Sequence, residues 1–185
     1  MIKDVLKDIE SRMKKSVDAL DAELKSMRIG KASPALLDNL RVEYYGTKVP
    51  INQVANVSAP EPRLLVVQTW EKDMVDEVVK AIMKSEMGLN PSTEGNIIRI
   101  PIPPMSEERR KETVKLVKKF GEDCKVAIRN VRRDANDRLK TADKNKEISE
   151  DQMRKGQDQV QEVTDKYTKS IDELVEKKEK EVMEV

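Results

Sequence analysis

The sequence contains no histidine and only one cysteine, Cys124, among its 185 residues. A single thiol excludes a disulfide framework, and the lack of histidine removes the most common metal ligand and general base. Glycine-rich phosphate-binding loops are also missing, because the six glycines are dispersed along the chain. We therefore expect no cofactor, no metal site and no enzymatic activity, and we expect Cys124 to be a small buried hydrophobic residue.

Aromatic residues make up only 3% of the chain and hydrophobic residues 37%, so the sequence is unlike that of a protein with one large core. No apolar stretch approaches the length of a transmembrane helix, and the first residues do not resemble a signal peptide. The sequence thus predicts a cytoplasmic protein with no membrane partner. The 36 basic and 35 acidic residues nearly cancel, which together with strong helical periodicity predicts long solvated helices.

Two helical regions, residues 1–29 and 106–185, enclose a region of different composition. Apolar residues recur in them every three or four positions, which is typical of amphipathic helices. Ser106 is a good N-cap for a second helix of near forty residues, and the segment from Ser149 to Gln152 has the form of a capping box that opens a third. Such helices bury their apolar stripes only against one another, so we predict an elongated antiparallel three-helix bundle.

The enclosed region, residues 31–104, is richer in strand and turn residues. Strand patterns precede and follow a short helix, which we expect to be capped by Asp73 and to run to about Ser85. The predicted class is α+β, with a small β/α/β domain inserted into the bundle. The chain passes between the domains at residues 28–34, the outward crossing, and 101–106, the return crossing. Residues that interrupt regular structure predict hinges there: Gly30, Pro34, Pro103 and Pro104.

Basic residues gather on one side of the second long helix. At 100° per residue, a narrow sector beside the apolar stripe contains Lys118, Lys125, Arg129 and Arg132. Such a row suits the phosphates of an RNA backbone, which arginine binds through two parallel hydrogen bonds. The alternative is a solvated face neutralised within the helix, for instance by Asp134 with Arg138.

A second basic group flanks the two crossings. Arg28 and Lys31 lie at the outward crossing, and residues 109–111 follow the return crossing. They form a second patch if the crossings are adjacent, and otherwise they only solvate a helix end. The larger aromatic side chains do not alternate with basic residues, so we expect them to pack in the core or at its rim: Tyr44, Tyr45, Trp70 and Phe120.

Several short segments occur in a characteristic order: Gly30–Asp38, Val42–Thr47, Gly88–Pro91, Arg99–Pro104, Glu107–Lys111, Val126–Asp137 and Ile148–Asp151. In sequence and separation they resemble the ribosome recycling factor family over essentially the whole chain. One departure is the outward crossing, where the family commonly has Arg-Thr-Gly-Arg and this chain has Arg28-Ile29-Gly30-Lys31. A contact of Lys31 with RNA would therefore be that of a point charge.

The resemblance implies an L-shaped monomer with dimensions like those of transfer RNA. It implies binding to the ribosomal RNA of the large ribosomal subunit after peptide release, and splitting of the ribosome together with elongation factor G and GTP. The residues that match the family's RNA-binding positions are Arg28, Lys31, Arg110, Arg129, Arg132 and Arg133, to which the helical pattern adds Lys125.

Salt dependence separates this function from its rival, a helical adaptor or chaperone that binds a protein partner. Binding to phosphates should weaken steeply as salt rises, whereas apolar binding should be nearly indifferent to salt. Stiffening of the outward crossing by Gly30→Pro should preserve the fold and the RNA contact but reduce subunit splitting.

Overall fold

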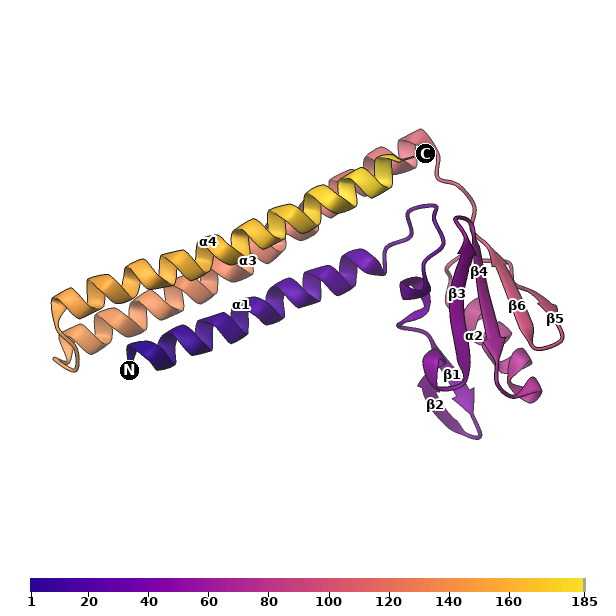
Figure 1. Ribbon diagram of the computed structural model, residues 1–185, viewed down its shortest axis with the longest axis horizontal. Helices are drawn as coiled ribbons and strands as arrows, with labels where there is room; N and C mark the ends of the chain where they lie inside the picture. Colours follow the sequence, from indigo (N-terminus) through magenta and orange to yellow (C-terminus); the bar gives the residue numbers. More distant parts are fainter. Residues whose placement is uncertain (185) are drawn as a thin grey trace. The chain divides into compact units, whose positions relative to one another are not determined.

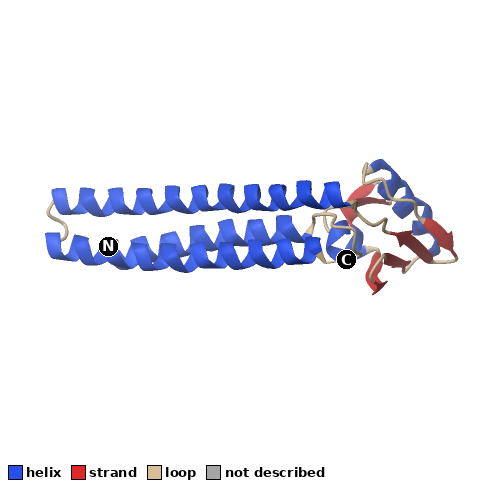
Figure 2. Ribbon diagram, turned by 90° about the horizontal axis from the view of Figure 1, so that it is seen from above, coloured by secondary structure: helices blue, strands red, loops and turns tan. Residues whose placement is uncertain are grey.

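The computed structural model describes residues 1–184, and its contacts divide the chain into two compact units. The first, here the bundle unit, contains Met1–Leu24 and Lys111–Val185, and the second, the small unit, contains Lys25–Arg110. All strands belong to the small unit (Figure 2). The α+β class is therefore confirmed. Among the helices described, none has an apolar stretch that could cross a membrane.

Three long helices lie side by side and form the bundle: α1 (Ile2–Lys25), α3 (Glu107–Lys144) and α4 (Glu150–Met183) (Figure 1). Helix α3 runs opposite to the other two, as predicted, and its 38 residues match the expected length. Both predicted caps are confirmed: the Ser106 hydroxyl accepts a hydrogen bond from the Arg109 N–H at 3.2 Å, and Ser149 forms a capping box with Gln152. Helix α1 ends at Lys25, short of residue 29, because the chain turns at residues 26 and 27.

One apolar seam holds the bundle together. Fully or almost fully buried side chains recur at helical spacing on all three helices, among them Ile9, Met13, Ile128, Leu139 and Ile171. Cys124 lies on this seam with 8% of its surface exposed, and its thiol donates to the backbone carbonyl of Ser16 at 3.4 Å. Burial raises the pKa of the Cys124 thiol, so the residue acts as the small hydrophobe that was predicted.

The turn between α3 and α4 explains how two such long helices return on each other. The Glu147 N–H donates to the Ala142 carbonyl and the Lys146 N–H to the Asp143 carbonyl, both at 2.9 Å. This is a Schellman motif, in which Lys146 takes the left-handed conformation that glycine usually occupies, with φ +60°. Helix α3 thus ends in a compact turn after Lys144.

The small unit contains a β-hairpin, a four-stranded antiparallel sheet and one helix. The hairpin is β1 (Arg41–Tyr44) with β2 (Thr47–Pro50), and the helix is α2 (Val75–Lys84). The sheet has the order β3-β4-β6-β5, formed by β3 (Ala55–Glu61), β4 (Leu64–Thr69), β6 (Ile97–Pro101) and β5 (Ser92–Glu94). Side chains from the sheet, the hairpin and α2 share one core, which includes Val42, Leu65, Val78 and Ile98.

The start of α2 differs from the prediction. Asp73 does not cap the helix, because it lies within a 3₁₀ turn, Lys72–Met74, that leads directly into α2. The N-cap residue of α2 is Met74, which is 4% exposed and forms no side-chain cap hydrogen bond. Burial of Met74 in the core therefore sets the start of the helix.

The two crossings lie next to each other within the small unit. The β3–β4 turn binds both, since the Ala32 N–H donates to the Pro62 carbonyl at 2.7 Å and the Ile102 N–H to the Arg63 carbonyl at 2.8 Å. Gly30 has φ +76°, and a Cβ added to it would lie 2.9 Å from the backbone nitrogen of Met105. Proline requires a negative φ near −65°, so the expectation that Gly30→Pro preserves the local fold is wrong.

Helices α3 and α4 approach each other closely at Gly121, so a larger residue at this position should change the stability of the bundle. A Cβ at this position would lie 2.6 Å from Cγ2 of Val175. We expect Gly121→Ala to lower the free energy of unfolding by about 1 kcal/mol, because overpacking outweighs the gain in helix propensity. In a Val175→Ala background the clash is absent, and the same change should raise the free energy of unfolding by about 1 kcal/mol. Urea titration of the four proteins measures this reversal, and a change of the same sign in both backgrounds would contradict close packing at Gly121.

Candidate nucleic-acid interface

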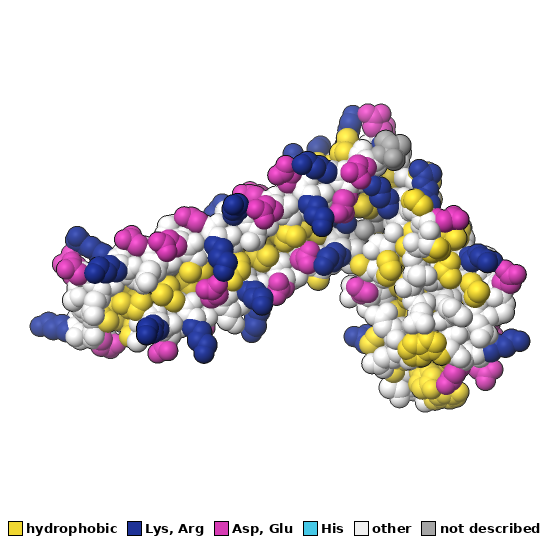
Figure 3. Space-filling view, in the orientation of Figure 1, with side chains coloured by type: hydrophobic (Ala, Val, Ile, Leu, Met, Phe, Trp, Pro, Cys, Tyr) yellow, Lys and Arg dark blue, Asp and Glu magenta, His cyan; other side chains and the backbone are white. Residues whose placement is uncertain are grey.

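Charges along the α1–α3 edge of the bundle neutralise each other across the two helices. Arg12 of α1 contacts Asp134 of α3 at 2.6 Å, and Arg138 of α3 contacts Asp8 of α1 at 2.9 Å. Asp134 and Arg138 therefore do not pair with each other, because each has a partner on α1. Pairing within α3 does occur at Glu122, which lies 3.8 Å from Lys125 and 4.0 Å from Arg129. On the face of the bundle that Figure 3 shows, acidic and basic side chains are accordingly intermixed.

The other two edges of the bundle also carry ion pairs. Between α1 and α4, Glu10 accepts hydrogen bonds from Lys166 at 2.9 Å and from the Tyr167 hydroxyl at 3.2 Å. The hydrogen bond from Lys166 lowers the pKa of Glu10. Between α3 and α4, Lys125 contacts Asp172 at 2.6 Å, and its side chain is only 22% exposed. Lys125, a predicted RNA-binding residue, thus already links two helices of the bundle.

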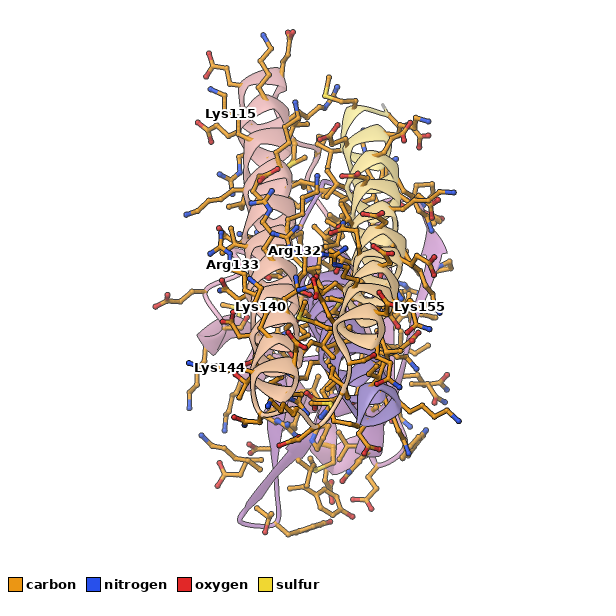
Figure 4. All side chains as sticks on the ribbon, turned by 90° about the vertical axis from the view of Figure 1, so that its left-hand side faces the viewer. Lys115, Arg132, Arg133, Lys140, Lys144 and Lys155 are labelled. Atoms are coloured by element: carbon orange, nitrogen blue, oxygen red, sulfur yellow. The ribbon has the colours of Figure 1, made fainter. Side chains whose placement is uncertain are left out.

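Arg132 lies on the side of α3 that faces α4 (Figure 4) and is half-buried. Within residues 1–184 its guanidinium forms no ion pair, although acidic side chains are abundant on the neighbouring helix. One turn further along α3, the side-chain oxygen Oδ1 of Asn136 is buried and has no hydrogen-bond partner in the described part of the chain. We call Lys125, Arg132 and Asn136 the inner row. Of the inner row, Lys125 is held by Asp172 and the Asn136 oxygen is buried, so only the Arg132 guanidinium is left to bind an external anion.

A second row of basic residues lies on the outer side of α3, away from α4 (Figure 4). It consists of Lys115, Arg133, Lys140 and Lys144, all exposed. At 100° per residue these positions fall about 100° around the helix from Arg132. Within residues 1–184 none of the four forms an ion pair, and the row spans about 44 Å along α3, although Glu122 falls in the same sector between Lys115 and Arg133.

Arg129 stands between the inner and outer rows. It is exposed, and its only ion pair in the described residues is a long one of 4.0 Å to Glu122. Residues 129, 132 and 133 thus place three guanidinium groups within about one helical turn. Because arginine can grip phosphate through two hydrogen bonds, this cluster has the chemistry that an anion-binding site on α3 requires.

The remaining predicted RNA-binding residues belong to the small unit, near the crossings. Arg28 is exposed, and its guanidinium lies beside Gly88, 3.9 Å from the point that a Cβ on this glycine would occupy. Lys31 and Arg110 are half-buried. A hollow of about 400 Å³ is lined on its charged side by Arg28 and Arg109, and on its apolar side by Leu89, Ile102, Pro103, Pro104 and Met105.

Sequence reasoning missed most of the outer row. It counted Arg133 but neither Lys140 nor Lys144, which follow it at intervals of seven and four residues on the same face. A projection of the whole helix, with only the cations marked, would have found them. Among the described residues, no group of acidic residues or cysteine is arranged to hold a metal ion.

Comparison with known proteins identifies a family for the chain. The sequence model of the family described as ribosome recycling factor matches residues 20–183. The ribosome-recycling factors of Clostridium perfringens (strain SM101) and Carboxydothermus hydrogenoformans are 54% and 51% identical to the chain over 185 residues, and the alignments cover all of both proteins.

Solved structures agree with the sequences. A solution structure of the ribosome recycling factor is 42% identical, covers all of this chain and 98% of its own, and superposes with a TM-score of 0.82. The T. thermophilus ribosome recycling factor, from models of that factor and the E. coli elongation factor G bound to the E. coli post-termination complex, is 44% identical over the full length of both chains with a TM-score of 0.71. This chain therefore belongs to the ribosome recycling factor family.

Proposed function

We propose that this protein binds the large ribosomal subunit after termination and, together with elongation factor G and GTP, splits the ribosome into its subunits. It acts as a cytoplasmic monomer and performs no chemistry itself, since the partner hydrolyses GTP. The bundle unit provides the contact with ribosomal RNA. The small unit moves relative to the bundle and transmits the force that separates the subunits.

Family membership supports this proposal at the level of the whole protein. Relatives that align over the complete chain are named ribosome-recycling factors, and one structural neighbour is bound with elongation factor G to a post-termination complex. The observation that carries the RNA contact is local to this chain: Arg129, Arg132 and Arg133 cluster on one helix without strong ion pairs in the described residues, while the edges of the bundle are neutralised.

The physical reason is electrostatic. Each arginine that displaces a counterion from RNA increases the affinity of the complex, because the released ion gains entropy. A guanidinium that is already paired with a carboxylate increases the affinity less. Arg132 therefore contributes more than Lys125, whose ammonium group is held by Asp172. We also propose that three residues of the small unit contact RNA: Arg28, Lys31 and Arg110. Because the bundle is stiff along its length, docking by α3 orients the whole unit on the RNA.

The hinges are a proposal based on the crossings. Hydrogen bonds from the β3–β4 turn fix residues 32 and 102 to the small unit, so motion is confined to the shorter segments outside them. One of these segments contains Gly30 with its positive φ, and the other contains Pro103 and Pro104, which stiffen the chain. Pro34 begins a 3₁₀ helix, Pro34–Leu37, that packs into the small unit, so in this proposal it lies beyond the hinge.

We predict that Arg132→Ala weakens binding to large ribosomal subunits by about 1–3 kcal/mol, because a charge-assisted hydrogen bond is lost. The matched control is Arg154→Ala, which removes the same charge from an exposed side chain of α4 that pairs with Glu150 in its own helix. Sedimentation with purified large subunits measures both affinities, and circular dichroism should show unchanged helicity. Equal affinity of the wild type and Arg132→Ala would remove Arg132 from the interface.

The return crossing provides a test of force transmission. Replacement of both Pro103 and Pro104 by glycine makes this segment flexible, so movement of the small unit should no longer be passed efficiently to the bundle. We expect unchanged binding to large subunits but a several-fold slower splitting of post-termination ribosomes, followed by light scattering with elongation factor G and GTP. Splitting at the normal rate would show that stiffness of this crossing plays no part.

A further inference from the structure

The turn of the β1–β2 hairpin has an unusual composition for its geometry. Tyr44 pairs with Thr47, which leaves Tyr45 and Gly46 as a two-residue loop with φ values of +46° and +84°. Two positive φ values are those of a type I′ turn, in which asparagine, aspartate or glycine is favoured at the first position. A bulky aromatic residue at positive φ is strained, so the turn alone does not explain why tyrosine is present.

Tyr45 is nevertheless held firmly in place. Its ring contacts that of Tyr44 edge to face, with centroids 4.6 Å apart and planes inclined at 73°. The hydroxyls of Tyr44 and Tyr45 donate to the two carboxylate oxygens of Glu71 at 3.0 and 3.2 Å. These hydrogen bonds raise the pKa of both tyrosines, so the phenols stay protonated as donors. The ring is thus pre-organised.

This fixed ring is open to solvent. Tyr45 is 76% exposed, and Trp70, which precedes Glu71 in the chain, is 57% exposed. Figure 3 shows hydrophobic side chains, with acidic ones beside them, at the end of the small unit that carries the hairpin. Large exposed aromatic side chains that lose little entropy on binding are typical of the residues that dominate protein interfaces. A purely internal role would have buried these rings.

The charge around the rings indicates the class of partner. Glu71 and Asp73 lie beside Tyr45, and Asp73 acts on its phenol electrostatically. Only one cation, Lys72, lies between them in the sequence. Bases that stack on aromatic rings bring phosphates with them, and single-strand binding sites accordingly surround such rings with positive charge. Two carboxylates repel phosphate, so the surroundings favour a protein partner over RNA.

We propose that Tyr44, Tyr45, Trp70, Glu71 and Asp73 form a docking surface, the aromatic end, for a protein surface that presents lysine or arginine beside an apolar hollow. This proposal rests on the proposed function and deepens it. The β3–β4 turn, which binds both crossings, lies at one end of β4, and Trp70 directly follows the other end. A partner that pushes here therefore acts far from the hinge, where a given force produces the largest torque.

Three variants test the aromatic end. Tyr45→Asn removes the ring but keeps a residue that tolerates positive φ, and Trp70→Gln removes the second aromatic side chain. Met83→Gln is the matched control, because Met83 is 60% exposed on α2 of the same unit and lies outside the proposed surface. Urea unfolding should show that all three proteins remain folded.

With post-termination ribosomes, elongation factor G and GTP, we expect Tyr45→Asn and Trp70→Gln each to slow splitting at least about tenfold, as loss of an interface hot spot does. Met83→Gln should split at the wild-type rate, and all three should sediment with large subunits like the wild type. Normal splitting by both aromatic variants would overturn the docking surface. Failure of the wild type to bind large subunits would instead overturn the proposed function.

The class of partner is tested separately by placing the photoreactive residue benzoylphenylalanine at position 45. After irradiation in the same mixture with a non-hydrolysable GTP analogue, the cross-linked product should survive ribonuclease and be digested by protease. The peptide joined to position 45 should carry lysine or arginine. A cross-link to RNA, or no cross-link to protein, would contradict the proposal.

Discussion

A single narrow apolar seam must hold three long helices together, and the remaining surface of the bundle is left to charge. The seam is continuous enough that even Gly121 and Gly156 lie within it, where a larger residue would meet Val175 or Leu139. Such close packing makes the bundle a stiff rod. Stiffness allows a contact made at a few arginines to orient the whole bundle unit, Met1–Leu24 with Lys111–Val185.

Charge is sorted around this rod. Where helices meet, the ions pair across the edges, as in Arg12 with Asp134 and Lys125 with Asp172. Arg133 and the lysines of the outer row, where α3 faces solvent, and Arg132, on the side of α3 that faces α4, remain without ion pairs in residues 1–184 (Figure 4). A net charge of +1 thus conceals a local excess of cations without ion pairs on α3. The protein belongs to the ribosome recycling factor family, and the proposed contact with RNA depends on this excess.

Much of the fold was predictable because its signals are local. Helical periodicity and the cap at Ser149 predicted the bundle, and the apolar run in β4 predicted the central strand of the sheet. Strand β3 was missed because Asn56, Ser58 and Pro60 are poor strand formers, and its pairing with β4 supplies what propensity does not. At the candidate nucleic-acid interface, the sequence identified the basic residues but not the acidic residues with which they form ion pairs. Whether Arg138 forms an ion pair with Asp134 or with Asp8 depends on which helix packs against α3, and the sequence does not show this. For the same reason the ion pair of Lys125 with Asp172 could not be predicted.

The central claim is that three arginines of α3, none of them held by a close ion pair in the described residues, seat the protein on ribosomal RNA by displacing counterions. It is tested most directly by the salt dependence of binding to large ribosomal subunits, compared between the wild type and the combined variant Arg129→Ala, Arg132→Ala, Arg133→Ala. The account predicts that the slope of log affinity against log salt concentration becomes shallower by roughly one unit for each arginine removed. An unchanged slope would contradict it.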